Sequence, residues 1–388
     1  MPMLMAFYNK DQPTATAGGS DTPTIHFALT HDWELRGDGS GDIEQIQFAP
    51  LRKLLEIYRK HHVRTTFLPD LMQQIRFRQL ESEYPELKSS ADKWDEHVRE
   101  AFRQGHDVQL HLHPQWRDGR YENGRWHLNG DWSILNYDRD AAYAMLAAGK
   151  DYLEKLLRPI DSSYRCLAFR AGALAAAPSD HLFKSLVRLA IQLDVSIAAG
   201  LFVNDGNLQL DYRGCEEYFL PFYPDTEDAR KVSRTREEIV CVPLNHFYGS
   251  RRAVTRQNVA LIHQQLRRPA KASRIREQFE SKSRIGLVFE KIIVPAIKRK
   301  HFVSDMSRLS YPLMREMLAS TRQRARQSGL SQVPVVLTNH PKDIRDVAAI
   351  ERFVGKASRA KDITFATLTE MAGKLESGEF RVRMSDKL

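Results

Sequence analysis

The stretch TIHFALTHDWE, residues 24–34, decides the fold. Its first residues form the apolar and β-branched run of a buried strand, and the polar residues His31, Asp32 and Glu34 follow at once. Residues two apart in an extended chain point to the same side, so Asp32 and Glu34 are expected to share a face. One acid could bind a metal while the other takes a proton. A strand that simply leaves the core into a polar loop would look the same, and this stretch alone leaves both interpretations open.

Short apolar or β-branched runs alternate with helical patterns along the rest of the chain. This alternation predicts a parallel β/α barrel or a doubly wound sheet, with polar residues just after the strands, where such folds assemble their sites. The expected strands are residues 24–30, 63–68, 108–112, 166–169, 193–197, 239–244, 333–337 and 363–366. The expected helices include residues 50–61, 91–104, 140–157, 179–192, 311–328, 342–356 and 369–375.

A second polar strand end lies in GHDVQLHLHPQW, residues 105–116. His111 and His113 are two residues apart, so they project to one face, a spacing that suits two imidazole ligands on one metal. Asp107 or a backbone carbonyl could orient one of the rings. The alternative is a pair of ordinary core or surface histidines.

Two more strand ends carry reactive side chains. Arg170, in the sequence Phe-Arg-Ala-Gly, would be buried and would therefore need an acidic partner, for which Asp32 is the natural candidate. The alternative is an ion pair elsewhere in the core. His340 follows the run at residues 333–337 and could act as a general acid, because its ordinary pKa is near neutrality. The pair Asn245-His246 is a weaker copy of this pattern.

The order of these motifs resembles that of the polysaccharide deacetylases, also called the NodB-homology or carbohydrate esterase family 4 fold. The resemblance covers roughly residues 24–375, with a basic segment as an insertion. It implies a distorted parallel β/α barrel of about seven or eight strands. It also implies that Asp32 is the catalytic base, that Arg170 positions the base, and that His340 is the general acid.

The metal ligands depart from the family pattern at two positions. The family has two adjacent Asp residues where this chain has Asp32-Trp33-Glu34, so Trp33 occupies the expected ligand position. The second family histidine would be the fourth residue after His111, which here is a glutamine. The resemblance therefore implies Glu34, His111 and His113 as ligands of one divalent ion, with zinc as the expected metal and Asp32 as the alternative to Glu34.

The implied reaction is removal of an N-acetyl or similar acyl group from an amino sugar in a polysaccharide or glycan precursor. Two alternatives stay open: a same-fold hydrolase of a non-sugar C–N bond, such as a ureide or cyclic amide, and a non-catalytic glycan-binding member. The aromatic stretch at residues 117–137 could stack on a sugar ring or form a packed hairpin.

Charge divides the chain unevenly. Residues 251–300 contain 14 Lys and Arg against three acids, so this segment carries +11 and the remainder −2 of the total of +9. We expect a mostly helical basic insertion, residues 251–310, that could dock on an anionic membrane, although Pro295 interrupts any single helix. Neither a zinc-finger nor an RNP-type pattern supports a nucleic-acid partner. The other expected parts are a leader (1–23), two barrel segments (24–250 and 311–378) and a tail (379–388).

The three cysteines are odd in number and widely spaced, so neither a disulfide framework nor a thiolate zinc site is expected. Residues 1–23 lack the charge and apolar core of a signal peptide. These features predict a cytoplasmic location, with contact to the inner face of the membrane through the basic insertion.

Overall fold

The computed structural model describes residues 22–206, 208–267 and 300–385. The predicted leader lies almost wholly outside these ranges, and so does the part of the basic insertion between residues 268 and 299. The prediction of a membrane-docking element falls largely on those residues and stays a prediction. No helix within the described ranges has the length and apolar character needed to cross a membrane.

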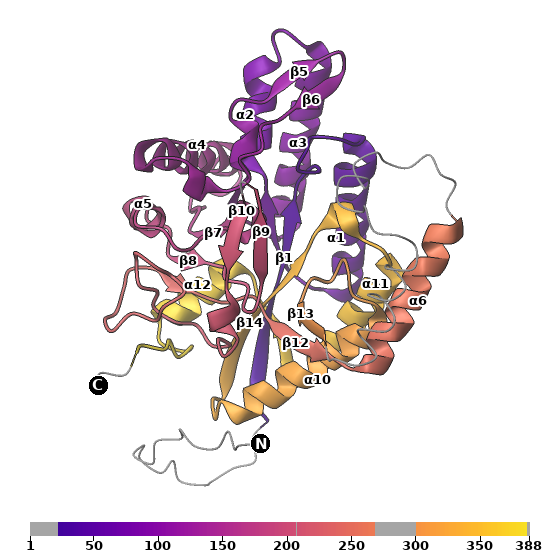
Figure 1. The fold of residues 1–388 in the computed structure, drawn as a ribbon, viewed down its shortest axis with the longest axis vertical. Coiled ribbons are helices and arrows are strands. Elements are labelled where there is room, and N and C mark those ends of the chain that lie inside the picture. Colours follow the sequence, from indigo (N-terminus) through magenta and orange to yellow (C-terminus); the bar gives the residue numbers. More distant parts are fainter. Residues whose placement is uncertain (1–21, 207, 268–299, 386–388) are drawn as a thin grey trace.

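One parallel sheet contains the strand that opens the chain. Its order is β14 (Gln332–Asn339), β1 (Thr24–Trp33), β2 (Thr66–Pro69) and β3 (Asp107–Val108), and β15 (Ile363–Phe365) pairs with the first part of β1. Strand β1 is buried along almost its whole length, as expected for a strand covered on both faces. It pairs with β14, β2 and β15 and therefore lies inside this sheet; Figure 1 shows it near β14.

The second sheet is also parallel, in the order β4 (Leu110–Leu112), β7 (Ala168–Ala171), β8 (Leu193–Asp194) and β11 (Val240–Cys241). Two junctions connect it with the first sheet. Only Gln109 separates β3 from β4, and its backbone N–H donates to the Phe67 carbonyl of β2 at 2.9 Å. After β11, Leu244 pairs in parallel with Val336 of β14. The strands therefore follow one another around a distorted barrel, as predicted.

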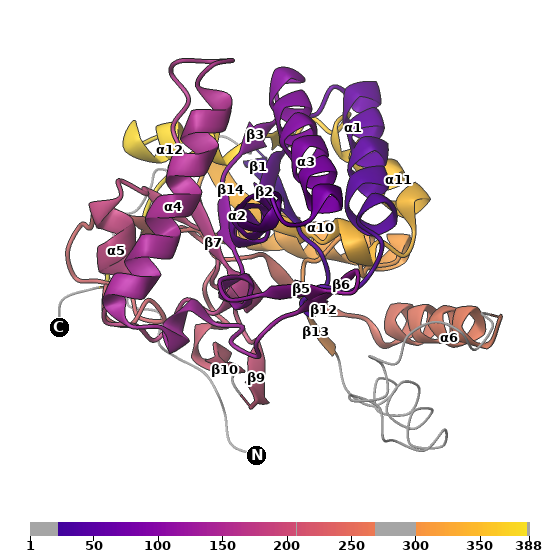
Figure 2. The same ribbon diagram turned by 90° about the horizontal axis from the view of Figure 1, so that it is seen from above.

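Helices surround these strands (Figures 1 and 2). Local signals define several of their ends: Asp138 caps α4 by accepting from Ala141 N at 2.8 Å, and Thr367 and Glu370 form a capping box at α12. The helices of the barrel are α1 (Ala49–His61), α2 (Leu71–Leu80), α3 (Pro85–Arg103), α4 (Arg139–Leu157), α5 (Leu182–Arg188), α10 (Tyr311–Gln327), α11 (Val347–Ala357) and α12 (Leu368–Glu376).

The sequence did not predict α2. This helix buries Leu71, Met72, Gln73, Gln74 and Phe77, and these residues mix apolar and amide side chains. A helix whose buried residues include amides has no apolar stripe, so periodicity does not reveal it.

Three two-stranded antiparallel sheets stand apart from the barrel sheets in the described residues. Two are hairpins, β5 (Arg120–Glu122) with β6 (Arg125–His127) and β9 (Phe202–Asp205) with β10 (Leu208–Asp211). In the third, β12 (His246–Gly249) pairs with β13 (Lys300–Val303), which lies about fifty residues further along the chain. The basic segment begins as helix α6 (Arg251–Arg267), which is helical as expected.

Candidate metal centre and catalytic residues

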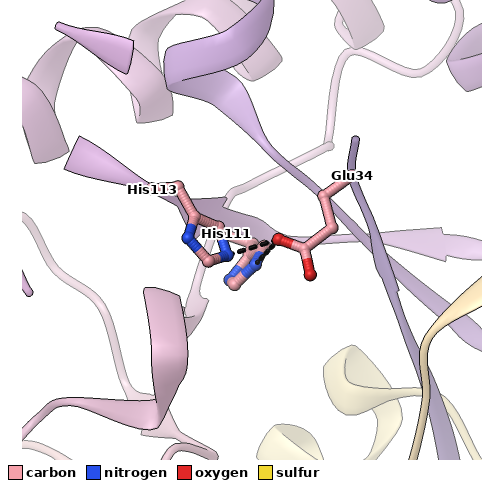
Figure 3. Close-up of side chains that lie close together, drawn as sticks. All are labelled: Glu34, His111 and His113. Carbon is pink, nitrogen blue, oxygen red and sulfur yellow. Dashed lines mark hydrogen bonds and ion pairs between the residues drawn. The ribbon is translucent and has the colours of Figure 1, made fainter. Parts of the chain in front are cut away.

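Glu34, His111 and His113 come together at the carboxyl ends of β1 and β4 (Figure 3). Their ligand atoms all lie within 4.8 Å of one another, and all three residues are buried. Oxygen Oε2 of Glu34 is 3.3 Å from His111 Nε2 and also contacts His113 Nε2. Among the described residues this is the group of His, Cys, Asp and Glu side chains whose spacing suits a metal ion.

His111 is oriented by the neighbouring strand. Its Nδ1 donates a hydrogen bond of 2.9 Å to the carbonyl oxygen of Arg170 in β7. This bond places a proton on Nδ1, and the other ring nitrogen, Nε2, faces Glu34. A histidine that binds a metal usually has this arrangement. Asp107, the other residue considered for this role, instead binds Thr66, Gln109 and Thr369.

His113 is held through its backbone and by tight packing. Asp70 Oδ1, at the end of β2, accepts from His113 N at 3.0 Å. The ring packs on Gly172, where an added Cβ would lie 2.6 Å from the Leu112 carbonyl oxygen and 3.0 Å from His113 Nδ1. Since real Cβ atoms rarely approach so closely, the glycine of the Phe-Arg-Ala-Gly sequence leaves room for this ring.

The two carboxylate oxygens of Glu34 face different partners. While Oε2 faces the histidines, Oε1 accepts from Lys342 Nζ at 2.7 Å. Burial alone would raise the pKa of Glu34, but the charges of His113 and Lys342 and the hydrogen bonds from the histidines hold it well below its usual range. Glu34 is therefore ionised across the physiological pH range.

Trp33 points away from this group, as strand alternation requires. Its indole Nε1 donates to the Gln47 carbonyl oxygen at 2.8 Å, and its ring packs near Phe48 and Trp94. Trp33 is thus a core residue. The acidic side chain that reaches the histidines is that of Glu34, two residues after Asp32.

Asp32 lies between two basic side chains, Arg170 and His340. Its Oδ1 forms an ion pair with Arg170 Nη1, and its Oδ2 is 3.4 Å from His340 Nε2. Arg170 is fully buried and also donates through Nε to the Val195 carbonyl oxygen at 3.1 Å. The other nitrogen of the His340 ring, Nδ1, is 3.1 Å from Asp305 Oδ2. The structure therefore brings together the sequence-predicted residues Asp32, Arg170 and His340, with Asp32 in contact with both of the others.

The buried charges shift the pKa values of His340 and Asp305 in opposite directions. Burial would lower the pKa of His340, but the charge of Asp305 and its hydrogen bond raise it above the usual value, with Asp32 adding to the effect. Burial would raise the pKa of Asp305, but His340 lowers it to about 2. His111 behaves similarly, since Glu34 and Asp32 outweigh burial and raise its pKa to about 9. A protonated His340 can donate a proton near neutral pH.

Three residues near the site were missed by the sequence reasoning: Asp70, Asp305 and Lys342. Asp70 caps the unexpected helix α2 and follows an apolar run, so an acid directly after a strand was the signal for it. Asp305 lies in the loop after β13 and no periodic pattern marks it. Lys342 was placed in a helix starting at that residue, whereas α11 begins at Val347 and Lys342 lies in a 3-10 turn, Pro341–Asp343.

Two other features singled out in the sequence, His246 and the aromatic stretch at residues 117–137, lie outside the metal group. His246 does not join the group: its Nδ1 is 3.0 Å from His301 Nε2. The aromatic stretch is a packed hairpin, because Trp126 stacks on Phe77 with ring centroids 4.9 Å apart and also meets Trp116 edge-on. The three cysteines are free thiols in the core.

The chemistry of the donor set fits a divalent transition metal. Two imidazoles and one carboxylate are the ligand types of catalytic zinc sites. Oxygen Oδ2 of Asp70 is buried without a hydrogen-bond partner, and the pKa of Asp70 is raised because burial disfavours its charge. A cation beside His113 and His111 would stabilise that carboxylate.

Gln115 Nε2 lies 3.3 Å from His113 Nδ1, while the Oε1 atom of Gln115 has no partner. Half a turn of this amide would supply the acceptor that a ligand histidine needs on Nδ1.

Comparisons with known proteins found neither a matching family model nor a curated protein that matches. Solved structures do match. A protein from Mycobacterium smegmatis described as a polysaccharide deacetylase is 15% identical, with a TM-score of 0.48, over 97% of this chain and 99% of that one. A protein from Pseudomonas aeruginosa PAO1 with the same description is 11% identical, with a TM-score of 0.45, over 92% and 93%.

A family 4 acetyl xylan esterase from Clostridium thermocellum, solved with a cobalt ion, is 11% identical, with a TM-score of 0.37, over 94% of this chain and 100% of that one. The structures to which the chain is similar thus include polysaccharide deacetylases and a family 4 esterase, the group that its motifs resemble. Every identity is 15% or lower and every TM-score quoted is 0.48 or lower.

Proposed function

We propose that this chain is a metal-dependent hydrolase that removes an N-acetyl or similar acyl group from an amino sugar in a polysaccharide or glycan precursor. The observation that carries the proposal is the position of Asp32. This carboxylate lies between Arg170 and His340, and its charge helps to raise the pKa of His111, one of the three residues of the metal group. A base, a general acid and a metal centre within one buried cluster are the parts that amide hydrolysis needs.

Each side chain has a distinct part in this reaction. Asp32 takes a proton from the attacking water, and Arg170 holds the carboxylate ionised and aimed through their ion pair. His340 donates a proton to the leaving amine, and Asp305 keeps it protonated by raising its pKa. A metal held by Glu34, His111 and His113, with zinc as the expected ion, would polarise the acyl carbonyl and lower the pKa of water. The amide and one water give a free amine and acetate.

Release of acetate tests this proposal. Metal-loaded protein is incubated with N-acetylated oligosaccharides, and in parallel with small ureides and cyclic amides, and the free amine and acid are measured. We expect acetate from the glycans and none from the Asp32→Asn variant. Activity on ureides or cyclic amides alone would replace the sugar substrate with the alternative C–N hydrolase. Glycan binding without any turnover would leave a non-catalytic binding protein.

The basic segment supports a second, separate proposal, contact with an anionic membrane at the cytoplasmic face. Helix α6 exposes Arg251, Arg252 and Arg256 while Ala253 and Val254 are buried, so its cationic side is available. Each Lys or Arg near an anionic surface contributes about 1 kcal/mol. Co-sedimentation with phosphatidylserine vesicles at low salt tests it. Binding that is absent, or that survives charge reversal at Arg251, Arg252 and Arg256, would contradict it.

A further inference from the structure

We propose that Lys342 keeps Glu34 a one-oxygen ligand by holding its second carboxylate oxygen. This inference rests on the proposed metal-dependent function and assigns a positioning residue to that site. Neither the motifs nor the comparisons point to this lysine.

The two oxygens of Glu34 have separate partners. Oε1 accepts from Lys342 Nζ at 2.7 Å, whereas Oε2 is the atom nearest both histidines, at 3.3 Å from His111 Nε2. The same ammonium also donates to the Leu35 carbonyl oxygen at 3.1 Å. These two bonds fix the ammonium at the backbone just after Glu34, on the side of the carboxylate away from the histidines.

Burial makes this arrangement stable. The side chain of Lys342 is only 14% exposed and that of Glu34 only 5%, so neither charge is well solvated. Removing a partner from such a pair leaves an uncompensated buried charge. The 3-10 turn Pro341–Asp343 directs Lys342 toward the site, and this turn is anchored because Asp343 accepts from Arg308 Nη2 at 2.7 Å.

The ligand count follows from this division. A free carboxylate can bind a metal through one oxygen or through both. Oε2 faces the histidines while Oε1 is held by the ammonium, so binding through both oxygens would require the carboxylate to turn and would strain a buried, charge-assisted hydrogen bond. The protein then supplies three ligand atoms, Glu34 Oε2 and the two histidine nitrogens, as in the three-ligand sites that leave a position open for water or substrate.

Charge adds a second consequence. The ammonium neutralises much of the negative charge that Glu34 would otherwise place on the metal. A metal held there would keep more of its positive charge and would attract an acyl oxygen more strongly, so Lys342 would favour catalysis as well as an open position.

Cobalt substitution tests the inference. Co²⁺ absorbs visible light more strongly in four-coordinate sites than in sites of higher coordination number, so its spectrum reports the ligand count without any substrate. Full-length wild type, Lys342→Met and Lys342→Arg are loaded with one equivalent of Co²⁺, and folding is checked by far-ultraviolet circular dichroism. Lys356→Met, at an exposed lysine of α11, is the matched control.

We expect strong visible bands in wild type, in Lys342→Arg and in the control, and a clear loss of band intensity in Lys342→Met as the second oxygen of Glu34 binds. A zinc-loaded crystal structure should show one Glu34 oxygen on the metal in wild type and both in Lys342→Met. An unchanged Lys342→Met spectrum, loss of cobalt from this folded variant, or both oxygens bound in wild type would overturn the inference. Failure of wild type to bind cobalt at all would instead refute the proposed metal-dependent function.

Discussion

Removal of Arg170 should destabilise the protein more than any exposed ion pair can. The guanidinium is fully buried and its partner Asp32 is only 3% exposed at the side chain. Replacing Arg170 with Met leaves the Asp32 carboxylate with His340 Nε2, 3.4 Å away, as its remaining cationic neighbour, and removes the bond to the Val195 carbonyl oxygen. Breaking one side of a buried pair costs about 3–5 kcal/mol. That is a large part of the roughly 5–15 kcal/mol by which folded proteins are stable.

A double-mutant cycle measures the pair itself. The free energy of unfolding in urea is determined for wild type, Arg170→Met, Asp32→Asn and the double variant. Because the double variant contains no unpaired charge at this position, it should be more stable than the sum of the single effects predicts, by about 1 kcal/mol or more. Lys88→Met is the control, since the Lys88–Asp92 pair is 59% and 49% exposed and should contribute less than about 1 kcal/mol.

Two results would refute this reasoning. One is an Arg170→Met variant that loses no more free energy of unfolding than Lys88→Met. The other is a cycle in which the two single effects add without coupling. Either would mean that Arg170 and Asp32 do not form the buried pair on which the position of the catalytic base depends.

Three further outcomes follow from the same contacts. Asp32→Asn should lower turnover at least about a hundredfold while leaving the circular dichroism spectrum unchanged, and near-native turnover would exclude Asp32 as the base. Asp305→Asn should lower the pKa of His340, because Asp305 is the main group that raises it; His340 then loses its proton at lower pH, so the alkaline limb of the rate profile should move down, and an unmoved limb would contradict His340 as the acid. Gly172→Ala should weaken metal binding about tenfold or more, since its Cβ would lie 3.0 Å from His113 Nδ1, and unchanged affinity by competitive titration would contradict this packing.

The barrel was predictable because its strands follow simple local rules. The run that begins at Thr24 is buried on both faces, so it reads as one apolar stretch, and the alternation at its end separates Trp33 from Asp32 and Glu34. Each of the eight expected strands has a counterpart, several of them shorter than predicted, but the strand expected at residues 108–112 forms two short strands, β3 and β4, in different sheets.

The residues that support the site were not predictable because long-range packing places them. Asp305 reaches His340 through the bridge between Asp305 and Thr338, which joins segments far apart in the sequence. Lys342 reaches Glu34 because Pro341 begins a short turn in place of the expected helix. Neither contact leaves a periodic signal, since both depend on tertiary structure.

The aromatic hairpin shows the same limit. Its tryptophans suggested a sugar platform as readily as a small core, and nothing in the local sequence distinguishes the two. Trp126 packs on Phe77 of α2, the helix that sequence periodicity did not reveal, so the partner that decides its role was missing from the prediction.

The metal content of the purified protein tests the central claim most directly. Wild type and the His111→Ala/His113→Ala double variant are loaded with zinc, desalted and measured by elemental analysis. The geometry of the Glu34, His111 and His113 group predicts one zinc per wild-type chain and a large loss in the double variant, with both proteins folded. A wild-type chain without metal, or a double variant that keeps one zinc per chain, would contradict the claim that this group is the metal centre.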